Sequence, residues 1–207
     1  MKIIVYSCNV GNYDNPIEDG RLYLEGGDKF NSDRLNSKIV KVLSHLFLPE
    51  HDYSIWVDAN IELLITPKEL VELMGDYECM VFKHPKRENI NQEIIECGLK
   101  DTEKNKQYHK DKPGLLAACG IVVRKNTETV NRLNEKWWAE ICRGSFRDQL
   151  SFPYTLGTIS KYIKTEWREP FNSKYTKWHP HNKNTKNEDI SDKQKQIQLD
   201  YIIKNFY

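Results

Sequence analysis

The sequence predicts an α/β domain in which a mainly parallel sheet is covered by helices on both faces. Two observations support this fold class. Apolar, β-rich runs alternate along the chain with segments of helical periodicity, as in βαβ units. The 207 residues, 39% of them hydrophobic, can also bury one substantial core. We therefore expect a single domain over residues 1–207.

The elements follow from local patterns. Residues 2–8 form a first strand, and turn-forming residues follow at 9–16. From Ser32, a suitable N-cap residue, apolar side chains recur at helical spacing until Pro49. Further strands are expected at 54–57, 79–82, 119–124 and 159–166, further helices at 67–74, 89–97, 127–142 and from 147 to 156, a loop or loose helix at 101–112, a polar flap or solvated connection at 172–195, and a last amphipathic helix at 196–207.

Composition excludes several classes of protein. The 31 basic and 30 acidic residues nearly balance, so no global field favours nucleic acid. No apolar run approaches the length of a membrane span, and the N-terminus leads into a strand instead of a signal peptide. We expect a cytoplasmic protein. The five cysteines are scattered, which indicates reduced, mostly buried thiols and neither disulfides nor a zinc site.

An acidic residue and an amide follow the apolar strand at 54–57. Asp58 and Asn60 lie two residues apart at its carboxyl end, where ligands collect in α/β sheets. Hard oxygen ligands of this kind suit Mg²⁺ or Mn²⁺, which would bridge the phosphates of a nucleotide. The alternative is an ordinary turn, because Asp and Asn favour turns for their own reasons.

Several segments together resemble a known family. They are IWVDANIE at 55–62, VFKHPKR at 81–87 with Glu93 after it, GLLAACGI at 114–121, the Trp137-Trp138 pair, and RDQLSFPY at 147–154. In this order the chain resembles the GT-A glycosyltransferases, and most closely the glycosyltransferase-like family catalogued as domain of unknown function 616. Its size and layout are also similar to the compact capsid-glycosylating domains of large algal viruses. Asn60 departs from the usual Asp-X-Asp motif, so one negative charge is missing.

The resemblance implies where a nucleotide sugar would bind. The first strand and its loop would hold the nucleoside, and Ala59 lies between the two diphosphate-site residues Asp58 and Asn60. Basic groups of the following helix would reach the base or the diphosphate, with Arg34 and Lys38 favoured and Lys41 expected on the solvated face. The alternative for the loop is a tight turn capped by Asn. The loop residues concerned are Ser7, Cys8, Asn9, Val10, Gly11 and Tyr13.

Asp148 and Gln149 correspond to the catalytic carboxylate and carboxamide of the resembled enzymes. Asp148 would act as general base in an inverting transfer, or the two groups would stabilise an oxocarbenium-like transition state in a retaining one. The alternative is that Asp148 caps a helix and pairs with Arg147. The sequence does not separate these possibilities.

Late histidines complete the implied site. His179 or His181 could bind the metal, and Lys183 could neutralise a phosphate, although an exposed polar loop would explain the same residues. His84 is expected to orient acceptor or backbone. The Trp137-Trp138 pair is expected in the core rather than on a sugar platform.

The sequence thus predicts a metal-dependent hexosyltransferase. The expected partners are a nucleotide-sugar donor, with UDP-glucose or a similar UDP-sugar favoured, and a glycan or glycoprotein acceptor, with additional domains possible in a longer polypeptide. One alternative is a sugar-nucleotide nucleotidyltransferase, although the loop after the first strand lacks the expected basic residues. The other is a non-catalytic carbohydrate-binding module with a decayed donor site.

Overall fold

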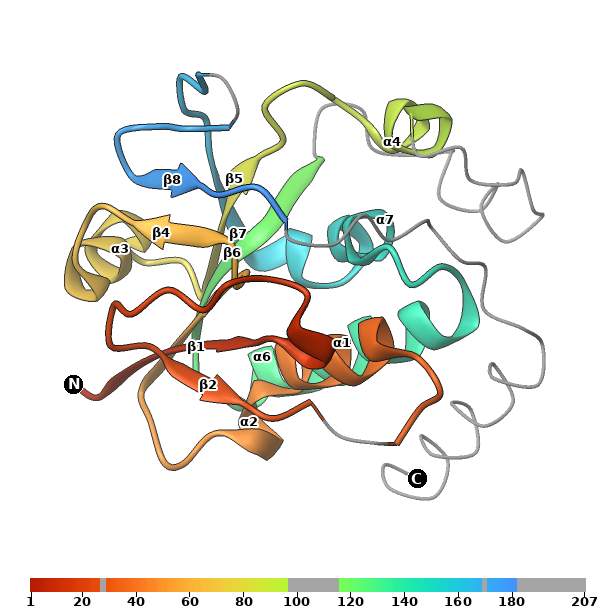
Figure 1. Cartoon of the computed structure of the whole chain (residues 1–207), viewed down its shortest axis with the longest axis horizontal. Helices are drawn as coiled ribbons and strands as arrows, with labels where there is room; N and C mark the ends of the chain where they lie inside the picture. The colour runs from red at the N-terminus through yellow and green to blue at the C-terminus, as the bar shows by residue number, and fades with distance from the viewer. Residues whose placement is uncertain (27–28, 97–115, 169–170, 182–207) are drawn as a thin grey trace.

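A six-stranded sheet forms the centre of the protein in a computed structural model that describes residues 1–26, 29–96, 116–168 and 171–181. The strand order is β2-β1-β3-β6-β5-β7 (Figure 1). β6 (Ala117–Lys125) is antiparallel to both its neighbours, whereas the other strands share one direction. These are β1 (Ile3–Cys8), β2 (Leu22–Leu24), β3 (Tyr53–Val57), β5 (Cys79–Lys83) and β7 (Ser160–Ile163). The predicted α/β class with a mostly parallel sheet is confirmed.

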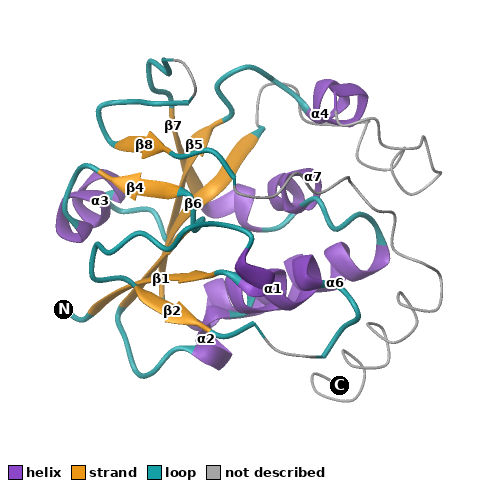
Figure 2. Ribbon diagram, in the orientation of Figure 1, coloured by secondary structure: helices purple, strands orange, loops and turns teal. Residues whose placement is uncertain are grey.

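Helices cover both faces of the sheet (Figure 2). Alternate residues of one strand face opposite cores: Trp56 packs with the first cluster, whereas Ile55 and Val57 pack with the second. The first cluster includes residues of α1 (Asp33–Val42) and α6 (Glu128–Arg143), and the second those of α3 (Pro67–Met74). Shorter helices are α2 (Ser44–Phe47), α4 (Ile90–Glu96) and α7 (Asp148–Ser151).

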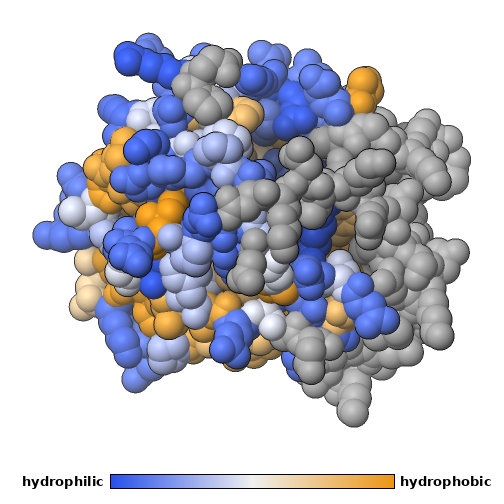
Figure 3. Space-filling view, in the orientation of Figure 1, coloured by the Kyte–Doolittle hydropathy of each residue, from blue (hydrophilic) through white to orange (hydrophobic). Residues whose placement is uncertain are grey.

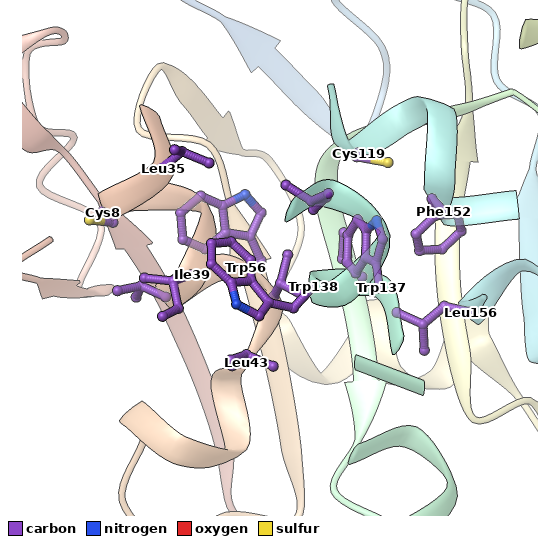
Figure 4. Close-up of a cluster of buried hydrophobic side chains, with 14 of the residues drawn as sticks. Cys8, Leu35, Ile39, Leu43, Trp56, Cys119, Trp137, Trp138, Phe152 and Leu156 are labelled. Atoms are coloured by element: carbon purple, nitrogen blue, oxygen red, sulfur yellow. The ribbon is translucent and has the colours of Figure 1, made fainter. Parts of the chain in front are cut away.

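The tryptophan pair of α6 lies in the first cluster, as expected. Trp137 and Trp138 are fully buried, and Figure 4 shows them beside Trp56 of β3. The described cysteines are free, buried thiols, also as expected, and Cys97 lies outside the described residues. Burial raises the pKa of both Cys8 and Cys79 to about 11.

Several elements differ from the sequence prediction. Ser32 does cap α1, its hydroxyl accepting from the backbone N–H of Leu35, but the helix is interrupted at Leu43 before α2 begins. The helix expected over 147–156 is only α7, followed by 3₁₀ turns at Phe152–Tyr154 and Leu156–Ile159. The strand expected at 159–166 is the shorter β7.

Short strands were not expected from the sequence. β4 (Ile61–Leu63) pairs antiparallel with β8 (Thr176–Trp178) in a separate two-stranded sheet. β8 therefore corrects the interpretation of residues 172–195 as only a flap or a solvated connection. β2 was also unexpected. The segment 101–112 and the helix at 196–207 lie outside the described residues.

A buried arginine of β6 fixes the carboxyl end of α1. Arg124 donates from Nη1 to the carbonyl of Val42 (3.0 Å) and to Asn134 Oδ1 (2.9 Å). Its Nη2 donates to the carbonyl of Lys41 (2.8 Å) and to the hydroxyl of Tyr6. The last carbonyls of a helix have no partner within it, so this side chain supplies one. The end of α1 is thereby tied to the sheet and to α6.

His45 of α2 predicts a pH-dependent stability. Burial and the neighbouring Arg124 lower the pKa of His45 to about 4. The unfolded chain takes up this proton near pH 6.5 but the folded chain does not, so stability falls as the pH drops from about 6.5 to 4. We expect His45→Gln to reduce this loss, measured by urea unfolding at pH 7, 6, 5 and 4.5. If the stability of His45→Gln fell with pH as steeply as that of the unmodified protein, the neutral, buried state of the His45 ring would be contradicted.

The surface is mainly polar. On the face in Figure 3, hydrophilic side chains predominate among the described residues and hydrophobic ones form small separate groups. Within the described ranges, no helix has the length and apolar character needed to cross a membrane.

Candidate functional site

A cavity of about 370 Å³ opens at the carboxyl ends of β1 and β3. This volume is within the range of small-molecule sites, roughly 300–1,000 Å³. Lining residues come from the loop after β1, one side of α1, β3 and the turn after it, β6, the start of α7 with the residues just before it, and His181 after β8. The predicted site residues among the lining are Cys8, Asn9, Gly11, Tyr13, Arg34, Lys38, Asp58, Ala59, Asn60, Asp148, Gln149 and His181.

The turn after β3 positions the acidic residue and the amide. The N–H of Ile61 donates to the carbonyl of Asp58 (2.9 Å), which closes a turn, and the N–H of Asp58 donates to the carbonyl of Gly120 on β6 (2.8 Å). The alternative of an ordinary turn therefore describes the backbone, and the same turn directs Asp58 and Asn60 to the cavity. The two interpretations were compatible.

Arg21 braces this turn from outside the predicted site. The guanidinium is buried and donates to the carbonyls of Asp58 (3.3 Å) and Ile61 (2.6 Å), and it also pairs with Asp19. This role was not predicted from the sequence, because nothing near Arg21 indicates contact with a turn so far along the chain.

Protein groups contact one of the two oxygens of the Asp58 carboxylate. Its Oδ1 accepts from Trp56 Nε1 (2.6 Å) and lies 3.4 Å from Lys41 Nζ. No described residue pairs with Oδ2, and the side chain is 42% exposed. Asn60 is instead buried, and its Nδ2 donates to the carbonyl of His179 (2.9 Å). Asp58 thus offers one free oxygen to the cavity.

A buried ion-pair network joins α1 to α7. The Nζ atoms of Lys38 and Lys41 lie 2.7 and 2.6 Å from Asp148 Oδ2. The Lys41 side chain is 2% exposed and also contacts Asp58. The expectation that Lys41 lies on the solvated face of the helix was wrong, because two carboxylates compensate its burial. Lys38, favoured from the sequence, does line the cavity.

This network fixes the charge of Asp148. Burial by itself raises the pKa of Asp148, but the ammonium groups of Lys38 and Lys41 outweigh it and hold the pKa well below its usual value. For Lys41, burial lowers the pKa, and the carboxylates of Asp148 and Asp58 outweigh that effect, so its pKa is raised. Asp148 is therefore ionised and weakly basic. A general base works best with a pKa near the operating pH, so this geometry favours a binding or electrostatic role.

Arg147 has a different partner from the expected one. It pairs with the fully buried Glu93, which also lies 2.8 Å from Arg87 Nε. Arg147 is the N-cap residue of α7, and no side chain caps this helix. The interpretation of Asp148 as a cap paired with Arg147 was wrong, because each side chain has another charged partner. Glu93 thereby ties α4 to the start of α7.

The loop after β1 is closed by its own asparagine. Asn9 Nδ2 donates to the carbonyl of Asp14 (2.6 Å), and Asn9 Oδ1 accepts from the N–H of Asp14 (3.0 Å). Gly11 has a φ of 67°, and a Cβ there would lie 2.6 Å from Asp33 Oδ2, so glycine suits this position. The predicted Asn-capped turn therefore exists and also lines the cavity. Ser7 is the exception, because it is fully buried and is not among the lining residues.

The two late histidines separate. His181 lines the cavity, with Nδ1 2.7 Å from Asp14 Oδ1 and its ring 4.7 Å from that of Tyr13. His179 does not line the cavity, and its Nε2 lies 2.9 Å from Glu62 Oε2. Of the two, His181 is the better metal-ligand candidate.

Lys183 lies outside the described residues. His84 accepts from the backbone N–H groups of Lys86 and Arg87, consistent with its expected orienting role.

The residues present fit a divalent cation that is shared with a bound diphosphate. Among the described residues, no three His, Cys, Asp or Glu side chains form a cluster that could hold a metal alone. Asp58, Asn60 and His181 line one cavity and offer a carboxylate oxygen, an amide oxygen and a ring nitrogen. Mg²⁺ usually takes one or two carboxylates and completes its shell with phosphates and water. A sparse protein ligand set is suitable for such a cation.

Comparisons with known proteins agree on a class of domain. The family model of the TOD1/MUCI70 glycosyltransferase-like domain matches residues 23–172. The probable hexosyltransferase MUCI70 of Arabidopsis thaliana is 24% identical over 167 residues, 67% of this chain and 27% of that protein. The alkaline ceramidase TOD1 of the same plant is 26% identical over 156 residues, 63% of this chain and 33% of that protein. The chain therefore spans at most 33% of the length of these two relatives.

Solved structures with a similar chain path include three glycosyltransferases. Mouse xyloside xylosyltransferase 1 in its apo form has 14% identity and a TM-score of 0.41, covering 71% of this chain and 63% of its own. A glycosyltransferase involved in glycosylation of the major capsid of PBCV-1 has 9% identity and a TM-score of 0.45, covering 79% and 81%. Galactosyltransferase LgtC, in complex with donor and acceptor sugar analogues, has 7% identity and a TM-score of 0.45, covering 79% and 73%.

Proposed function

Because the chain belongs to the TOD1/MUCI70 glycosyltransferase-like domain family, we propose that it transfers a hexose from a UDP-sugar to a hydroxyl of a glycan or glycoprotein acceptor. The observation that carries this proposal is the cavity at the ends of β1 and β3. The loop after β1 offers backbone and the Tyr13 ring, and α1 offers the ammonium groups of Lys38 and Lys41. The turn after β3 offers a carboxylate oxygen of Asp58. A nucleotide diphosphate needs all three.

The loop after β1 is the proposed nucleoside site. Asn9 and Gly11 bring backbone to the cavity wall, and the Tyr13 ring lies beside His181. A flat ring of this kind can stack on a base. Arg34 lines the same cavity from α1 and is the cation nearest in sequence to this loop among the lining side chains. Its proposed role is contact with the base or the diphosphate.

The diphosphate would lie beside Asp58. Mn²⁺ or Mg²⁺, when bound by Asp58, Asn60 and His181, would neutralise the charge that develops on the leaving diphosphate. Lys38 and Lys41 bring positive charge to the same cavity, although Asp148 compensates part of it. The turn that carries Asp58 is held by Arg21 and Gly120, so its carboxylate is positioned before a ligand arrives.

Asp148 and Gln149 are the proposed groups nearest the transferred sugar. Asp148 is held ionised by two lysines and would accept hydrogen bonds from sugar hydroxyls or stabilise positive charge on the anomeric carbon. No described residue hydrogen-bonds the Gln149 side chain, so its amide is available to a ligand at the cavity wall. These roles fit a retaining transfer better than one that needs Asp148 as general base.

A donor screen tests the proposal. Purified protein would be incubated with UDP- and GDP-hexoses, with and without Mn²⁺, and the release of free nucleotide diphosphate would be measured. Release from at least one UDP-hexose, stimulated by Mn²⁺, is expected. Absence of both nucleotide release and UDP binding would overturn the proposal. Because one relative is named an alkaline ceramidase, fatty acid release from a short-chain ceramide would be followed in parallel, and activity in that assay alone would favour the other reaction.

A further inference from the structure

A second cavity of about 140 Å³ adjoins the candidate donor cavity. Gly120 of β6 and Gln149 of α7 line both cavities, so they mark the boundary between them. Four of the twelve lining residues of the smaller cavity are Phe or Trp, and they come from separate parts of the chain. The aromatic residues are Phe82, Trp167, Phe171 and Trp178. Nothing in the proposed donor site uses them.

The aromatic rings continue from one cavity to the other. The Phe171 and Trp178 rings lie 6.1 Å apart at 72°, and the Trp178 and His181 rings lie 6.0 Å apart at 88°. His181 in turn contacts Tyr13 in the donor cavity. Phe171 has a φ of 79°, a strained conformation for a non-glycine residue that is concentrated at functional sites. A strained residue therefore holds one ring of this row in place.

We infer that the smaller cavity binds one pyranose ring of the acceptor, an inference that rests on the proposed function. Aromatic walls suit the apolar C–H faces of a sugar ring, and few polar groups are needed to orient it. The amide of Gln149 lies at the boundary and can hydrogen-bond the hydroxyl that points toward the donor. The absence of a side chain at Gly120 keeps the boundary open, since a Cβ there would lie 2.7 Å from Ile61 Cδ1 and 3.3 Å from Asp58 Oδ2.

The size of the two cavities supports this division. The smaller cavity has less than half the volume of the larger one and is lined without any lysine, arginine or acidic side chain. A diphosphate would have no cation there, whereas a neutral sugar needs none. The acceptor terminus is therefore inferred to be a neutral glycosyl residue.

Binding of simple glycosides tests the inference without requiring turnover. Methyl α- and β-glycosides of glucose, galactose, mannose and xylose would be added to the protein with and without saturating UDP, and saturation-transfer difference NMR would detect binding. At least one glycoside is expected to bind the unmodified protein. Trp178→Ala is expected to weaken its affinity at least tenfold, whereas Tyr77→Ala, which removes an exposed aromatic ring that lines neither cavity, should leave it unchanged.

A second variant guards against misfolding at β8. Ala118→Leu fills the smaller cavity from β6 and keeps the aromatic walls, so it should also abolish glycoside binding. Thermal melts would verify that each variant folds. The inference is overturned if no glycoside binds, if both variants retain binding, or if UDP displaces the glycoside, which would place the sugar in the donor cavity. Calorimetry with UDP on the same samples distinguishes two kinds of failure. If only the acceptor site is wrong, UDP still binds, whereas if the proposed function is wrong, UDP does not bind.

Discussion

Asp148→Ala is expected to lower the free energy of unfolding by about 3–5 kcal/mol, the usual cost of removing one partner from a buried ion pair. The substitution leaves Asp58, at 3.4 Å, as the remaining carboxylate beside the buried Lys41 among the described residues. It also leaves two ammonium groups close together without the carboxylate between them. Urea unfolding at pH 7 would measure the loss. Below about pH 4 the difference should shrink, because Asp148 contributes stability above its unfolded pKa and loses it as the pH falls through its lowered folded pKa.

An exposed ion pair provides the matched control. Glu128 pairs with Arg132 on the surface of α6, so Glu128→Ala should change stability little. The double variant Lys41→Met with Asp148→Leu should recover part of the loss, since apolar side chains can replace a buried pair. If Asp148→Ala is no less stable than Glu128→Ala, the carboxylate does not compensate the buried lysines.

Asp58→Asn is expected to reduce transfer by about 100- to 1,000-fold, the range observed when one preorganised electrostatic group is removed. The amide can still accept the hydrogen bond from Trp56 Nε1, so the turn should persist, but the negative charge that faces the proposed cation is lost. The measurement is the initial rate of nucleotide diphosphate release from the best donor at saturating Mn²⁺. The melting temperature should fall only modestly, because Asp148 still pairs with Lys41 and the Asp58 side chain is substantially exposed.

Glu62→Gln is the control for this variant. Glu62 is a carboxylate on the strand that follows the same turn, but it pairs with His179 and Lys177 and is not among the residues that line the cavity. Its replacement should leave the rate within a few-fold of the unmodified protein. Equal rates for Asp58→Asn and the unmodified protein would remove Asp58 from the proposed site, and equal losses in both variants would indicate a general effect of charge.

The parts of the fold that the sequence predicted are those with a local cause. β1, β3, β5 and β6 are apolar runs, and α3 carries a complete capping box in which Thr66 and Glu69 exchange hydrogen bonds. β4 and β8 have three residues each and exist because Ile61 pairs with Trp178 far along the chain. A run so short has no periodicity to detect, and its partner is set by the tertiary structure.

In the candidate site too, features with a local cause were predicted, and features that depend on tertiary contacts were not. Asp58 and Asn60 were predicted because they follow the carboxyl end of a buried strand, where ligands collect in α/β sheets. The loop after β1 was predicted from the family resemblance. Lys41 was assigned to solvent because lysines are seldom buried, and its contacts with Asp148 of α7 and Asp58 after β3 reverse that expectation. The distinction between His179 and His181 likewise depends on which acidic residue each one meets.

The clamp formed by Arg124 has a consequence for how ligands associate. Arg124 of β6 donates hydrogen bonds to the last carbonyls of α1. The segment that carries Lys38 and Lys41 therefore has little freedom to move when the cavity is vacant. A ligand then meets a wall whose charged groups are already in place, so little of its binding free energy is needed to order the protein. We expect this arrangement of charged groups to persist after the product leaves, so the next ligand would meet the same site.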